Sequence, residues 1–198
     1  MSLQFQNIKV IAFDADDTLW DNEPFFVEAE EKFTALLEDF LPRHTITREL
    51  LQTEIQNMEL YGYGVKAFML SMIETAIRIS EQKIPASVIE NILHIGRSML
   101  EKPVQLLDGV ENVLLQLKSD YRLVLATKGD LLDQERKLKK SNLEGFFHHI
   151  EIMSEKKEAD YKKLIRHLDI APEKLLNPKP LKRARQHQAQ NCFEAERS

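Results

Sequence analysis

Two acidic residues, Asp14 and Asp16, stand two positions apart directly behind an unbroken apolar run, Val10–Phe13. On an extended chain this spacing puts both carboxylates on the same side. Carboxylates held close together repel each other, so the pair favours either a shared proton or a divalent cation. A solvated polar turn is the alternative interpretation, because short acidic motifs often occur without a function.

Further polar residues with suitable chemistry follow at two later points of the chain. Thr127 ends an apolar run, and a hydroxyl with the amides of the following turn can hold a phosphate oxygen. Lys156 and Lys157 stand between an expected strand and an expected helix, where an ammonium group can neutralise the same ligand. Because ligands bind at the ends of strands in open α/β sheets, we expect these residues to share one site.

The elements that must position these residues alternate between strand and helix. Val10–Phe13 is apolar throughout rather than alternating, which is typical of a strand buried on both faces of a parallel sheet. Leu123–Ala126 shows the same pattern, and Ile150–Met153 shows it less clearly. Helical spacing of apolar residues predicts helices around residues 110–117, 131–138 and 161–168. This order predicts an α/β layered domain.

Residues 23–102 differ, because they hold successive amphipathic helices and no convincing strand. Four apolar stripes mark these helices: Phe26, Ala29, Phe33, Leu36 and Phe40; Leu51, Ile55 and Met58; Val65, Phe68, Met69, Met72, Ile73 and Ala76; and Val88, Ile92, Ile95 and Met99. Four such stripes can bury one another as a helical bundle. We therefore expect an α/β core from residues 1–22 and 103–176, with an all-α bundle, residues 23–102, inserted after the first strand.

Composition narrows the class of partner. Acidic residues outnumber basic ones by 32 to 27, which gives no reason to expect a nucleic acid or an anionic membrane as partner. No apolar stretch suits a signal peptide or a membrane span, so the expected location is the cytoplasm. The single cysteine, Cys192, stands in a polar segment, which disfavours thiol catalysis. The basic run Lys137–Lys140 is predicted to be solvated.

In three motifs the chain resembles the haloacid dehalogenase-like superfamily of phosphatases and phosphotransferases, over about residues 8–176. The matches are Asp14, Asp16 and Thr18 for Asp-x-Asp-x-Thr, Thr127 for a strand-ending Ser or Thr, and Lys156 for a Lys ahead of a helix, with Lys157 as the alternative. The resemblance implies a Rossmann-like parallel sheet. It also implies that the helical insertion is the cap that members of this family carry after the first motif.

This resemblance implies a role for each matched residue. Asp14 would be the nucleophile that forms an aspartyl-phosphate, and Asp16 would protonate the leaving oxygen and then activate water. Thr127 would hold a phosphoryl oxygen, and Lys156 would balance the charge of the transferring group. Mg2+ would bind the Asp14 carboxylate and the Asp16 backbone carbonyl. Dehalogenating members lack an acid at the position of Asp16, so the resemblance implies a phosphatase acting on a small phosphate monoester.

The fourth motif of the family, an acidic metal ligand after a further buried strand, has no match here. The strand candidate Lys174–Leu176 is followed by Asn-Pro-Lys-Pro, and the next acid is Glu194. We therefore expect weaker Mg2+ binding and reduced activity, because an unshielded like-charge pair at about 4 Å costs on the order of 4 kcal/mol near a protein surface. Three interpretations stay open: an impaired phosphatase, a catalytically inactive protein of the same fold, and a phosphotransferase.

Residues 177–198 differ in composition from the rest of the chain. They hold two prolines near their start, five Lys or Arg, two Glu and no sustained apolar period. We predict an irregular basic tail. One interpretation is an aberrant C-terminal end joined to the family sequence, and the alternative is a natural tail on a divergent member.

Overall fold

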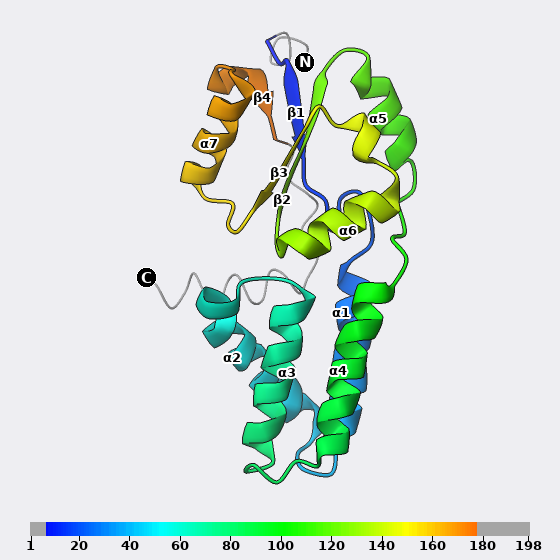
Figure 1. Ribbon diagram of the computed structural model, residues 1–198, viewed down its shortest axis with the longest axis vertical. Helices are drawn as coiled ribbons and strands as arrows, with labels where there is room; N and C mark the ends of the chain where they lie inside the picture. The colour runs from blue at the N-terminus through cyan, green and yellow to red at the C-terminus, as the bar shows by residue number, and fades with distance from the viewer. Residues whose placement is uncertain (1–6, 178–198) are drawn as a thin grey trace. The chain divides into compact units, whose positions relative to one another are not determined.

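Residues 7–177 are described by a computed structural model of the chain (Figure 1). Within this range the chain forms two compact units: unit 1 is residues 7–21 and 103–177, and unit 2 is Asn22–Lys102. Of the predicted irregular tail, only Asn177 lies within the described residues. Among these residues no helix has the length and apolar character that a membrane span requires.

Unit 1 is built on a parallel sheet with the strand order β3-β2-β1-β4. The strands are β1 (Val10–Phe13), β2 (Arg122–Lys128), β3 (His149–Met153) and β4 (Leu175–Leu176). β1 is buried along its whole length, as an unbroken apolar strand in a parallel sheet should be. Its pairing with β2 runs in register from Val10 opposite Arg122 to Phe13 opposite Leu125. Both strands therefore end at the same edge of the sheet.

Three helices complete unit 1: α5 (Val110–Lys118), α6 (Leu131–Ser141) and α7 (Glu158–Leu168), with short 3-10 turns at Glu144–Phe146 and Pro172–Lys174. Alternate residues of β1 serve two different apolar clusters, because successive side chains of a strand point to opposite faces. One cluster joins Ile11 and Phe13 to Leu114 of α5 and Leu138 of α6. The other joins Val10 and Ala12 to Leu164 and Leu168 of α7.

Unit 2 is an all-α bundle with its own apolar core. Its helices are α1 (Glu23–Leu36), α2 (Arg43–Tyr61), α3 (Val65–Ile79) and α4 (Ala86–Glu101). The third and fourth predicted stripes lie on α3 and α4 and supply Phe68, Met72, Ile92 and Ile95 to this core. The predicted fold class, a parallel α/β core with an inserted helical bundle, is thus confirmed.

Helix α2 buries a different face from the one that its apolar stripe predicts. Ile46, Leu50 and Thr53 are buried, whereas the predicted residues Ile55 and Met58 are only half-buried. The reason is polar pairing with α3, where the Thr75 hydroxyl donates to the Thr53 hydroxyl at 2.9 Å. Buried hydroxyls require such partners. The apolar pattern of the sequence does not reveal a helix face that is buried partly through hydrogen bonds between polar side chains.

Candidate active site

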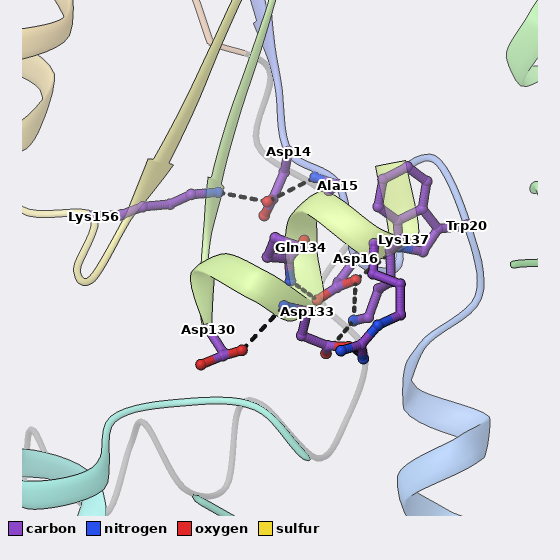
Figure 2. A network of polar contacts seen from close by, with 10 residues as sticks. Asp14, Ala15, Asp16, Trp20, Asp130, Asp133, Gln134, Lys137 and Lys156 are labelled. Atoms are coloured by element: carbon purple, nitrogen blue, oxygen red, sulfur yellow. Dashed lines mark hydrogen bonds and ion pairs between the residues drawn. The ribbon is translucent and has the colours of Figure 1, made fainter. Parts of the chain in front are cut away.

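Two of the predicted site residues, Asp14 and Lys156, form an ion pair at the carboxyl-terminal edge of the sheet (Figure 2). Lys156 Nζ lies 2.6 Å from Asp14 Oδ1, and the Ala15 backbone N–H donates to the same oxygen at 2.8 Å. Both side chains keep some solvent contact, with 18% of Lys156 and 23% of Asp14 exposed. Lys157 has a different place, because its backbone N–H donates to Asp160 in the first turn of α7.

Thr127 occupies the neighbouring strand at the same edge. It is buried near the end of β2 and pairs in register with Ile152 of β3. Phe13 of β1 is opposite Leu125, so Thr127 stands two residues beyond the last paired position of β1, level with the start of the acidic motif. The sheet register thus brings the predicted hydroxyl to the edge that carries Asp14.

A second lysine, Lys128, lies in this charged region and was not singled out by the sequence analysis. Burial lowers the pKa of Lys128, and the charge of Lys156 acts in the same direction, against the attraction of Glu155 and Asp14. A partly buried lysine with a lowered pKa and a specific charged neighbour is a candidate functional residue. In the sequence, the one indication that Lys128 belongs to this region was its position directly after Thr127.

The carboxylate of Asp16 faces a different set of partners, all of which donate hydrogen bonds (Figure 2). Its Oδ1 accepts from the Trp20 indole N–H at 2.8 Å and from Lys137 Nζ at 2.9 Å. Its Oδ2 accepts from the Gln134 side-chain amide at 2.8 Å. These donors fix the orientation of Asp16, whereas Asp14 is oriented by Lys156.

Helix α6 supplies two of these donors because polar side chains as well as Leu138 lie on its buried side. Asp130 caps the helix, and its side chain accepts from the Asp133 backbone N–H at 3.0 Å. Asp133 and Gln134 are buried, whereas Leu131 and Leu132 at the start of the helix are exposed. In this first turn the leucines are therefore exposed and the polar residues are buried, which is the opposite of what an amphipathic sequence pattern predicts.

Lys137 joins two carboxylates on that face. Only 16% of its side chain is exposed, and its Nζ lies 2.9 Å from Asp16 Oδ1 and 3.7 Å from Asp133 Oδ2. Burial raises the pKa of Asp133, opposed by the nearby charge of Lys137. The prediction of solvated charges at Lys137–Lys140 is wrong for Lys137. Its spacing of four residues from Asp133 was the one signal in the sequence.

Gly129 links β2 to α6 in a conformation that favours glycine. Its φ is +144°, and a Cβ at this position would lie 3.1 Å from the Gln134 amide nitrogen. Its backbone N–H donates to the Met153 carbonyl at 3.1 Å. The turn is therefore hydrogen-bonded to β3 on one side. On the other side, the absence of a Cβ leaves room for the Gln134 side chain.

The described residues fit a Mg2+ ion only in part. Asp14 can offer its carboxylate and Asp16 its backbone carbonyl, which are oxygen ligands of the kind that Mg2+ prefers. Within residues 7–177, the one group of three His, Cys, Asp or Glu side chains close enough to share an ion lies at His149, Glu151 and His167. Asp14 and Asp16 are outside it. In the described part of the chain, this edge therefore offers the Asp14 carboxylate and the Asp16 carbonyl, but no group of three side-chain ligands within 4.8 Å of one another.

The fold and this set of residues define a haloacid dehalogenase-like hydrolase. A family model of that description matches residues 8–176, so the chain belongs to this family. It is similar to a haloacid dehalogenase-like family hydrolase from Xanthomonas campestris, with 38% identity and a TM-score of 0.80. That match covers 87% of this chain and 74% of the other. The family resemblance predicted from the motifs is confirmed.

More distant structures share the fold. YfnB from Bacillus subtilis, described as a HAD hydrolase bound to magnesium, is 20% identical with a TM-score of 0.57, and the match covers 87% of this chain and 78% of that one. A predicted phosphoglycolate phosphatase from Haemophilus somnus is 18% identical with a TM-score of 0.54, covering 89% and 77%. Dehalogenases also match. A comparison with curated proteins gives no match.

Proposed function

We propose that the chain is a Mg2+-dependent phosphatase that hydrolyses a small phosphate monoester through an aspartyl-phosphate at Asp14. The observation that carries this proposal is the ion pair of Asp14 and Lys156 at the strand edge, next to strand β2, which carries Thr127 near its end. A carboxylate oriented by an ammonium group beside a hydroxyl is suited to attack on phosphorus.

The proposed chemistry assigns each step to a residue of this edge. The Asp14 carboxylate attacks phosphorus while the bond to the ester oxygen breaks, and Asp16 gives that oxygen a proton. Asp16 then takes a proton from the water that hydrolyses the aspartyl-phosphate. Thr127 and Lys156 hold the phosphoryl oxygens throughout. Mg2+, when bound by the Asp14 carboxylate and the Asp16 carbonyl, would reduce the repulsion between the carboxylate and the phosphate.

The phosphatase proposal is tested by hydrolysis of para-nitrophenyl phosphate across a Mg2+ titration. We expect turnover that saturates with metal in the natural protein and is abolished by Asp14→Asn. Asp17→Asn is the matched control, because it removes a neighbouring carboxylate at a residue with φ of +55°, a conformation that asparagine tolerates. Turnover that persists in pure Asp14→Asn protein would show that Asp14 is not the nucleophile.

A catalytically inactive member of the family is the second candidate function. The observation that favours it is that, within residues 7–177, no group of three His, Cys, Asp or Glu side chains that includes Asp14 or Asp16 converges within 4.8 Å. No turnover at any Mg2+ concentration, with the protein folded, would support this candidate. Dehalogenation is tested in parallel by release of chloride from 2-chloropropanoate, and phosphotransfer by product analysis with an added alcohol acceptor. Because dehalogenating members of the family lack an acid at the position of Asp16, we expect no chloride release.

A further inference from the structure

Three side chains of types that can bind a metal ion converge at the amino-terminal half of β3, away from the end that leads to Lys156. His149 Nε2 lies 2.9 Å from Glu151 Oε2, and His167 Nδ1 lies 3.1 Å from the same oxygen. One potential ligand atom from each residue falls within 4.8 Å of the other two. The cluster lies within unit 1, and none of its residues has a part in the proposed phosphatase chemistry.

Two neighbouring elements create this convergence. His149 and Glu151 are two residues apart on β3, so both side chains leave the same face of the strand. His167 comes from the last turn of α7, which packs against that sheet through Leu164 and Leu168. Because the strand and the helix are both fixed by the core, the three groups are held together without a flexible loop.

The distances suit a metal ion of the zinc class. Two imidazole nitrogens and a carboxylate oxygen bind Zn2+ at roughly 2.0–2.2 Å, so that tetrahedral ligand atoms lie about 3.3 Å apart. The two observed separations between the imidazole nitrogens and Glu151 Oε2, 2.9 and 3.1 Å, are a few tenths of an ångström shorter. The side chains are 32%, 14% and 44% exposed for His149, Glu151 and His167, which leaves an approach for solvent as a fourth ligand.

Glu151 supplies the one carboxylate of this cluster. The ammonium group of Lys163 lies 4.0 Å from Oε1 of Glu151. It therefore contacts the other carboxylate oxygen and leaves Oε2 facing the two imidazoles.

We propose that His149, Glu151 and His167 form a binding site for a divalent transition-metal ion of the Zn2+ class. The ion would have two imidazole ligands, one carboxylate and water, and it would link the edge strand β3 to helix α7. Such a site is chemically distinct from a Mg2+ site, which is built from oxygen ligands. The alternative is that the same three side chains form a hydrogen-bonded cluster that binds no metal.

The test is a titration of the metal-free full-length protein. Zn2+ binding is measured by calorimetry and Co2+ binding by its visible absorption, in the natural protein and in His149→Gln and His167→Gln. His148→Gln is the matched control, because this adjacent histidine is outside the cluster. We expect one bound ion per chain, roughly tenfold or more weaker binding in both cluster variants, and natural binding in the control.

A thermal shift gives a second measurement that does not depend on activity. Zn2+ should raise the Tm of the natural protein and of His148→Gln, but not that of the cluster variants, because a ligand that binds the folded state stabilises it. Equal Zn2+ affinity in all variants would overturn the proposal, as would no binding at millimolar metal. Loss of binding in Cys192→Ser would also overturn it, because the thiol would then be a ligand.

Discussion

At the scale of single residues, the surroundings of Asp16 bear most directly on the proposed chemistry. Its carboxylate accepts from an indole, an amide and an ammonium group. A residue that gives and takes a proton must stay within reach of the reacting oxygen, so donors that fix its orientation matter for catalysis. We therefore regard Lys137 as a positioning residue for Asp16.

Replacement of Lys137 by methionine tests this role. We expect kcat for para-nitrophenyl phosphate to fall roughly tenfold to a hundredfold, with little change in KM. This loss is smaller than the whole contribution of a general acid or base, because Asp16 itself is still present. Lys139→Met is the matched control, because Lys139 is exposed on the same helix. Steady-state kinetics of the two variants and of Asp16→Asn provide the comparison. A kcat of natural size in Lys137→Met would contradict the assignment.

Gly129 provides a residue-scale prediction about stability. Gly129→Ala should lower the free energy of unfolding by about 1–3 kcal/mol, because its φ of +144° is unfavourable for alanine. The new Cβ would also press on the Gln134 amide that donates to Asp16. Gly145→Ala is the control, since nothing lies within 4 Å of a Cβ there. Urea denaturation of both variants checks the result, and equal losses would argue against strain at Gly129.

At the scale of elements, apolar patterning predicted the strands well and the polar faces poorly. β1 and the position of Asp14 follow directly from an unbroken apolar run, and strand ends in one parallel sheet meet at one edge. The polar face of α6 did not follow, because Asp133 and Lys137 look like solvated charges in the sequence. The ion pairs with Asp16 and Asp133 show that Lys137 is largely enclosed.

An ion pair between Glu28 of α1 and Lys102, the residue that follows α4, gives a pH prediction. Hydrogen bonds from Lys102 and then Lys32 lower the pKa of Glu28 from 4.5 to about 2. The stabilisation is therefore complete above the unfolded pKa of 4.5 and is lost as the pH falls from there toward 2. Because Glu28 is 41% exposed, solvent screening limits its value to less than about 1 kcal/mol.

Replacement of Glu28 by glutamine should accordingly lower stability at pH 7 and matter progressively less below pH 4.5. Urea midpoints of the natural protein and of Glu28→Gln, measured from pH 7 to pH 3, provide the check. Glu31→Gln on the same exposed helix surface serves as the control. A difference that stays constant over this pH range would show that the charge of Glu28 is not its cause.

At the scale of the whole molecule, each unit has its own apolar core. Met72 is fully buried in the cluster of unit 2, and Leu114 is 1% exposed in a cluster of unit 1. Truncating either side chain should cost about 2–5 kcal/mol. We expect Met72→Ala to increase hydrogen exchange mainly in α1–α4, and Leu114→Ala mainly in α5 and the strands that it covers. The same exchange profile in both variants would contradict separate cores.

Trp20 is the single tryptophan of the chain. It is 1% exposed, and its indole N–H donates to the carboxylate of Asp16. All tryptophan emission of the protein therefore originates one hydrogen bond from the proposed acid and base. When Asp16 gains a proton or turns toward a ligand, the electric field at the indole changes, and the emission changes with it. The protein thus contains an intrinsic optical reporter, which can follow events at Asp16 in rapid-mixing experiments without an added label.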